Sequence, residues 1–180
     1  MKLYRFSPIK NQQQLEKAIQ YTHEACYKLC HMALDAYLPV AGNVGIFCHY
    51  DNEYEKLTAL REKMTDPTIH FNKKYFKLHE PIIIPANGRI PAATYEYLYI
   101  RKPDPYRAQV GDVDFVMRTD KYQELKKLLR SGTEINAARL YEDSSGLDMV
   151  ELYDPDIDAL GYLTTSTMAE KIQEPRETWT

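Results

Sequence analysis

TYEYLYIRKPDPYRAQVGDVDF, residues 94–115, is the stretch from which we interpret the fold of this chain. It begins with tyrosines at every second position, crosses a basic turn that contains two prolines, and returns to an alternating pattern that includes Asp112 and Asp114. A period of two is typical of β-strands, and proline within a sheet is confined to edges and turns. The stretch therefore predicts two strands joined by a stiff loop.

Helical periodicity and further strand patterns surround this unit. Apolar residues three and four positions apart predict helices from about Gln12 to Tyr37, Asn52 to Met64 and Thr119 to Arg130. Other predicted elements are strands at 2–6, 44–49, 137–141, 148–153 and 159–164, an edge or irregular strand at 75–85, and a short helix at 166–173. Because strands and helices do not alternate strictly, the order favours the α+β class. We expect a long core helix and two or three shorter helices on a mostly antiparallel or mixed sheet.

Composition and length narrow the class of protein. The 180 residues are 44% hydrophobic and 27% charged, which predicts one domain over 1–173 with a frayed tail at 174–180. No apolar run is long enough for a membrane span, and three cysteines lie in apolar patterns, so we expect a cytoplasmic protein with reduced thiols. The net charge of −3 divides into 0, +4 and −7 over residues 1–70, 71–110 and 111–180. That acidic last third disfavours a protein that coats duplex nucleic acid.

The tyrosine row is the first candidate for a binding surface. If Leu98 and Ile100 face the helices, then Tyr97 and Tyr99, together with Tyr95, face the other way. An outward aromatic row that ends in arginine can stack a base or a nucleotide ring. The alternative is that these rings pack beneath loops or another sheet, with their hydroxyl groups at the rim.

The basic turn is the second candidate. Arg101, Lys102 and Arg107 fall within seven residues, and two prolines fix the backbone between them. Guanidinium groups held in this way can bind a phosphate or carboxylate group through two parallel hydrogen bonds. The structural alternative pairs the arginines with nearby acidic strands.

Asp112 and Asp114 are the third candidate. Carboxylates at positions i and i+2 of a strand share one face, where they can hold a divalent metal ion for phosphoryl transfer. The pair resembles the acidic half of the nucleotidyltransferase pattern, but the Gly-Ser turn which that family requires upstream is absent. The alternative is a structural pair that meets Arg101 or Arg107.

His49 and His79 are candidates for acid–base chemistry because each lies where a predicted strand gives way to a loop. Another histidine, His23, shares a helical stripe with Cys26 and Cys30, which we interpret as core packing rather than as a metal site. Each of these histidines can equally be structural.

Three functions remain open at this point. The first is binding of an anionic or phosphate-bearing ligand, such as a nucleotide or short single-stranded nucleic acid, at Tyr97, Tyr99, Arg101, Lys102 and Arg107. The second is a non-catalytic adaptor that uses the same tyrosine and arginine surface for a protein partner or a homodimer. The third is a phosphoryl-transfer enzyme that uses Asp112, Asp114 and a divalent metal as cofactor. Whether the protein is an enzyme is therefore undecided by the sequence.

Overall fold

A computed structural model of the chain describes residues 4–68, 74–142 and 148–166. Three helices, α1 (Gln12–Leu34), α2 (Asp51–Met64) and α3 (Thr119–Arg130), occur in these ranges. The strands are β1 (Val40–Phe47), β2 (Phe76–Ile84), β3 (Ala93–Arg101), β4 (Gly111–Met117), β5 (Ala138–Glu142), β6 (Asp148–Leu152) and β7 (Ala159–Thr165). The predicted α+β class is confirmed. No helix among the described residues is both long and apolar enough to cross a membrane.

The seven strands form one mixed sheet in the order β2-β3-β1-β4-β7-β6-β5. β1 is parallel to β3, and β4 is parallel to β7, whereas the other neighbouring pairs are antiparallel. β3 and β4 are the two strands predicted from residues 94–115. They do not pair with each other, because β1 lies between them at the centre of the sheet. Edge strand β2 is irregular, as its prolines predicted, with a register shift between Lys77 and Ile82.

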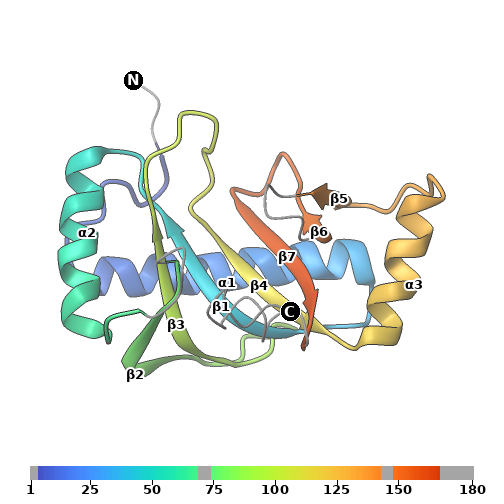
Figure 1. Cartoon of the computed structure of the whole chain (residues 1–180), viewed down its shortest axis with the longest axis horizontal. Helices are drawn as coiled ribbons and strands as arrows, with labels where there is room; N and C mark the ends of the chain where they lie inside the picture. The colour runs from blue at the N-terminus through green and yellow to red at the C-terminus, as the bar shows by residue number, and fades with distance from the viewer. Residues whose placement is uncertain (1–3, 69–73, 143–147, 167–180) are drawn as a thin grey trace.

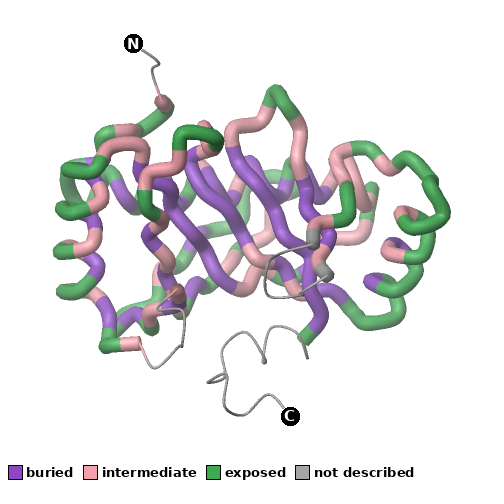
Figure 2. The backbone as a smooth tube through the Cα atoms, turned by 45° about the horizontal axis from the view of Figure 1, so that its top comes forward, coloured by how far each residue is buried: buried purple, intermediate pink, exposed green. Residues whose placement is uncertain are grey.

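Helix α1 covers one face of this sheet and buries the main core. Figure 1 shows α1 lying across the back of the central strands, with α2 and α3 at the two ends of the sheet. Its stripe, including Leu15, Ile19, Cys26 and Leu29, packs against residues such as Val113. Cys26 and Cys30 are buried free thiols, as the core-packing interpretation predicted. Buried positions run along the central strands, while the outer sides of α2 and α3 are exposed (Figure 2).

Two boundaries differ from the prediction. The long helix ends at Leu34 instead of Tyr37, because Asp35 takes a positive φ of 55° and turns the chain toward β1. Residues 4–6 form no strand, although 2–6 was predicted as one. Instead the Tyr4 ring stacks on His49 at 3.8 Å, and Phe6 has a left-handed φ of 67°. Residues 2 and 3 of that strand, residues 167–173 of the short helix predicted at 166–173, and the tail at 174–180 lie outside the described residues.

Candidate functional site

The sheet face opposite α1 gathers most of the predicted site residues. Since Leu98, Ile100 and Val113 are buried in the α1 core, their neighbours along the strands point to the other side. We call this other side the polar face. Its principal side chains are Tyr97, Tyr99, Arg101, Asp112, Asp114, Glu151 and Tyr162.

The tyrosine row is broken at its first member. Tyr95 is fully buried on the α1 side, and its hydroxyl group lies 2.8 Å from Nδ1 of His23. The expectation that Tyr95 shares a face with Tyr97 and Tyr99 is therefore wrong. The register shift in the β2–β3 ladder coincides with this change of side, since such irregularities re-aim side chains. Tyr97 and Tyr99 remain half-buried on the polar face.

The basic turn is organised by Asp104. Its carboxylate accepts hydrogen bonds from the Arg101 guanidinium at 3.3 Å and from the backbone N–H of Tyr106 at 2.9 Å. The N–H of Arg107 donates to the Asp104 carbonyl oxygen at 3.0 Å. This ordered turn leaves Lys102 exposed and presents the Tyr106 side chain to solvent, where the residue is 93% exposed. Arg101 points back over the Phe47 ring, at 5.0 Å from its centre.

Asp112 and Asp114 lie on the polar face as predicted, but in different surroundings. Asp114 accepts a hydrogen bond from the Tyr75 hydroxyl group at 2.9 Å. Asp112 is only 6% exposed, and its carboxylate lies over the backbone of Gly45 on β1. A Cβ atom at Gly45 would stand 2.2 Å from Asp112 Oδ1 and 3.3 Å from the Tyr99 ring. The missing side chain at Gly45 therefore makes room for the carboxylate.

Burial and the neighbouring carboxylate control the electrostatics of this pair. Burial, followed by the charge of Asp114, raises the pKa of Asp112 to about 6, against the opposing effect of Lys74, Arg101 and Arg107. The half-buried Lys74 has a raised pKa, because Asp114 and Asp112 outweigh the burial that disfavours its charge. A carboxyl group with a pKa in this range suits acid–base chemistry near neutral pH.

The surroundings do not support the metal-dependent alternative. Within the described parts of the chain, no three His, Cys, Asp or Glu side chains come together in a way that could hold a metal ion. Asp114 is already bonded to Tyr75, and the ammonium group of Lys74 supplies positive charge beside the pair. A divalent cation at the two carboxylates would take its other ligands from water or a substrate and would be repelled by the charge of Lys74.

A hollow of about 420 Å³ opens on the same face and includes Leu160, the residue that pairs with Asp112 in the β4–β7 ladder. We call it the arginine hollow; it is lined by Tyr106, Arg107, Gln109, Arg139, Tyr141, Glu151, Tyr153 and Leu160. The Glu151 side chain is 1% exposed. Its carboxylate oxygen Oε2 lies 2.5 Å from Arg139 Nη2, and Oε1 lies 3.5 Å from Arg107 Nη1. The Tyr162 hydroxyl group donates to the same carboxylate at 3.1 Å.

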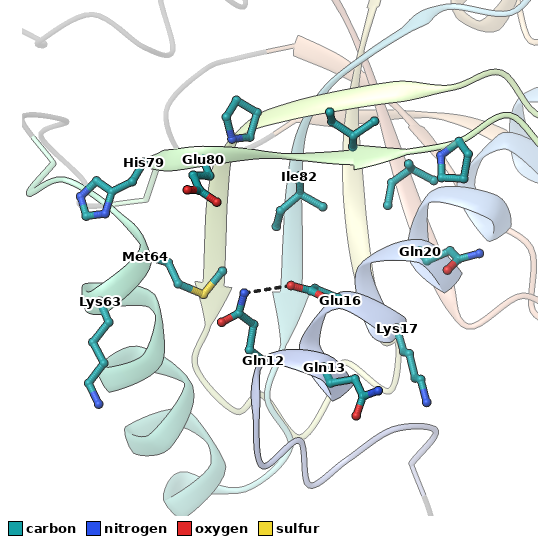
Figure 3. Close-up of a pocket in the computed structure, with 14 residues that line it drawn as sticks. Gln12, Gln13, Glu16, Lys17, Gln20, Lys63, Met64, His79, Glu80 and Ile82 are labelled. Atoms are coloured by element: carbon teal, nitrogen blue, oxygen red, sulfur yellow. Dashed lines mark hydrogen bonds between the residues drawn. The ribbon is translucent and has the colours of Figure 1, made fainter.

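The two predicted histidines lie away from this hollow and from each other. His49 Nδ1 is 2.7 Å from the Ser7 hydroxyl oxygen, so His49 ties the N-terminal segment to the end of β1. His79 is on edge strand β2, 3.2 Å from Asp66, at the rim of a separate pocket of about 680 Å³ between α1, α2 and β2 (Figure 3). That pocket is larger, but its lining balances two lysines against two glutamates and contains no Phe, Tyr or Trp.

The structure thus divides the predicted set. It brings Tyr97, Tyr99, Arg101, Arg107, Asp112 and Asp114 to one face, leaves Lys102 exposed on the turn, and places His49 and His79 elsewhere. The prediction missed four residues of this face: Lys74, Arg139, Glu151 and Tyr162. Each is an ordinary polar position in its own segment, and only the strand order β4-β7-β6-β5 brings the last three beside Arg107.

Comparisons with known proteins show a similar fold in one solved structure and give no information on function. No protein-family model matches the chain, and no curated protein matches it. A solved structure from structural genomics, described as protein EC4020, is similar in fold with a TM-score of 0.57. That likeness covers 96% of this chain and 97% of the other, at 14% sequence identity. At this level of identity the similarity concerns the architecture alone.

Proposed function

We propose that the arginine hollow binds a small anionic ligand through a phosphate or carboxylate group. One observation is decisive for this proposal. Arg107 and Arg139 both lie against the single buried carboxylate of Glu151, so the lining of the hollow has two positive charges and one negative charge. An anion between the guanidinium groups would balance the remaining charge, and arginine is well suited to bind it through two hydrogen bonds.

The accessibility of the two arginines supports the same function. The Arg139 side chain is 56% exposed and that of Arg107 is 22% exposed, whereas Glu151 is held at the floor. The guanidinium groups therefore reach solvent while their shared carboxylate does not. The Glu151 carboxylate fixes their positions before a ligand arrives, which lowers the entropic cost of binding.

The rim of the hollow is suited to an aromatic ligand. Arg139 lies over the Tyr153 ring at 4.6 Å, and Tyr141 packs against Tyr162 at 5.5 Å. Tyr106 stands exposed on the ordered turn beside them. In addition, no described residue donates to the buried amide oxygen of Gln109 in the lining. These groups provide stacking surface and a hydrogen-bond acceptor, which favours nucleotides among phosphate-bearing ligands.

Calorimetric titration with inorganic phosphate, AMP and a short oligo-dT tests the proposal. We expect AMP to bind more tightly than phosphate, and we expect both affinities to fall several-fold between 50 and 500 mM salt. R107A should abolish binding. R89A, which removes an exposed arginine on the turn between β2 and β3, is the matched control and should leave binding unchanged.

Two results would overturn this function. One is the absence of binding to every anion in the panel, and the other is an equal loss of affinity in R89A and R107A. Oligo-dT that binds far more tightly than AMP would assign the site to single-stranded nucleic acid instead.

A protein partner or a homodimer is a second candidate, favoured by the 93% exposure of Tyr106. Exposed tyrosines on ordered turns are common anchors of protein interfaces. Light scattering that shows a dimer in the wild type and a monomer in Y106A, without anion binding, would favour this candidate over the first.

A further inference from the structure

Asp112 differs from the other buried carboxylates in the described part of the chain. Glu53 accepts hydrogen bonds from the backbone N–H groups of Ile9 at 2.6 Å and His49 at 2.8 Å. Glu151 is bonded to Arg139 and to Tyr162. Asp112 is 6% exposed, yet none of the described residues donates a hydrogen bond to its carboxylate.

A mostly buried carboxylate destabilises the folded state unless donors reach it. The Asp112 oxygens are not among the fully buried polar atoms that lack a partner, so they remain accessible from the polar face. Gly45 maintains this arrangement, since any larger residue there would collide with Asp112 Oδ1. The chain therefore keeps an unpartnered acceptor at the centre of the sheet, which is typical of a group that receives its donor from a ligand.

Asp112 is one strand away from the arginine hollow. It pairs with Leu160 in the β4–β7 ladder, and Leu160 lines the hollow. Arg107 is close enough to lower the pKa of Asp112. Both Asp112 and Glu151 raise the pKa of Tyr162, so that ring lies within electrostatic reach of the two carboxylates. The acceptor and the anion site therefore lie on neighbouring strands of the polar face.

We propose that the ligand of this surface is a small zwitterion, whose phosphate or carboxylate binds Arg107 and Arg139 and whose ammonium group donates to Asp112. This inference rests on the proposed anion site and adds the second recognition element. Lys74, Arg101 and Arg107 offset the charge of Asp112 without a hydrogen bond to it, and an ammonium group on the ligand would supply the missing donors.

The test compares three kinds of probe by calorimetry: inorganic phosphate, ethanolamine, and aminoalkyl phosphates with two to four carbons between the charged groups. For the wild type we expect at least one aminoalkyl phosphate to bind roughly 10- to 100-fold more tightly than phosphate, as a hydrogen bond between charged groups implies. D112N should remove this advantage and leave the affinity for phosphate within about threefold. D114N changes the same charge two residues away on a partnered carboxylate, so it is the matched control and should preserve most of the advantage.

The outcomes separate this inference from the function on which it rests. If phosphate binds in a manner that depends on Arg107, and no aminoalkyl phosphate binds more tightly, the zwitterion is wrong and the anion site stands. If ethanolamine alone binds as tightly as the best aminoalkyl phosphate, Asp112 belongs to an independent cation site and the inference is also wrong. If neither phosphate nor any aminoalkyl phosphate binds the wild type, both proposals fail. The wild-type comparisons decide these cases even if D112N does not fold.

Discussion

Two buried side chains on opposite faces of the sheet, His23 and Asp112, differ in their hydrogen-bond partners. On the α1 face, both ring nitrogens of His23 have partners, with Nδ1 2.8 Å from the Tyr95 hydroxyl group and Nε2 3.0 Å from the Pro91 carbonyl oxygen. On the polar face, Asp112 has no hydrogen-bond donor among the described residues. A buried polar group whose partners are all internal stabilises the fold. The stability contributions of His23 and Asp112 are therefore expected to respond differently to substitution and to pH.

The largest effect expected from this contrast is at a pair of glycines on β1 and β4. A Cβ atom at Gly111 would stand 2.2 Å from the Gly45 carbonyl oxygen and 3.1 Å from the Thr22 hydroxyl oxygen on α1. Because backbone atoms cannot move aside without opening the sheet, G111A should lower the free energy of unfolding by roughly 3 kcal/mol or more. Denaturant unfolding measures this loss.

G45A is the matched control for that substitution. Its Cβ atom meets the end of the Asp112 side chain instead of backbone, so the side chain can turn away at a smaller cost. We expect a loss of about 1 kcal/mol, which D112A should largely relieve in the double mutant. Equal losses in G111A and G45A would contradict the distinction between the two faces.

The next largest effect is at His23. H23L leaves the Tyr95 hydroxyl group and the Pro91 carbonyl oxygen without their partner, so it should cost about 2 kcal/mol. Removing the hydroxyl group as well, in H23L/Y95F, should recover part of this loss, because one orphaned group disappears. A double-mutant cycle that shows no coupling between the two residues would contradict the role of this hydrogen bond.

His23 also predicts a pH dependence. Burial lowers its pKa below the ordinary value of 6.5, so the unfolded chain takes up the proton first. The stability that depends on neutral His23 is complete above pH 6.5 and is lost as the pH falls below that value. Unfolding at pH 5 and pH 7 should therefore show a smaller pH difference for H23L/Y95F than for the wild type.

Local sequence patterns predicted the positions of helices and strands well, but they were less successful in predicting which side of the sheet each side chain faces. The apolar period placed the start of α3 to within two residues and its end at Arg130, and the alternating patterns located β6 and β7 to within one residue. The same alternation placed Tyr95 on the wrong face, because it assumes a regular strand and cannot detect the register shift beside β2. Patterns with a period of two or 3.6 depend on near neighbours, and the shift depends on another strand.

The candidate site was predictable only in part for a similar reason. Arg107 and Asp112 belong to the central stretch and were found from its composition. The other charged residues of the arginine hollow, Arg139 and Glu151, come from β5 and β6, beyond α3 in the sequence. Pairing between strands so distant is decided by the topology of the sheet. The missing donor at Asp112 is likewise a property of the packed structure and has no signal in the sequence.

Substitution of Asp112 is expected to have a smaller effect of opposite sign, namely an increase in the free energy of unfolding. Since burial and Asp114 raise its pKa to about 6 from 3.8, the folded state disfavours the charged form. The contribution of Asp112 to stability is therefore most favourable below pH 3.8 and is lost as the pH rises through about 6. D112N should raise the free energy of unfolding by roughly 1 kcal/mol at pH 8 and leave it unchanged at pH 3.5.

D114N is the control for this reversal, because Asp114 has a partner in Tyr75. We expect D114N to be neutral or destabilising at pH 8. Between pH 4 and 6 the two faces then have opposite slopes: His23 makes stability rise with pH, and Asp112 makes it fall. A loss of stability in D112N at pH 8 would mean that Asp112 is a structural residue like His23.

The smallest effect on stability is expected at Tyr106. The residue is 93% exposed, and the turn beneath it is held by Asp104 through backbone groups that Y106A retains. The free energy of unfolding should therefore change by less than about 0.5 kcal/mol. The affinity for AMP should nevertheless fall several-fold while that for phosphate stays constant, because only AMP has a ring to stack. Equal affinities for AMP in Y106A and the wild type would mean that Tyr106 does not contact the ligand, and that Arg107 and Arg139 alone bind the anion.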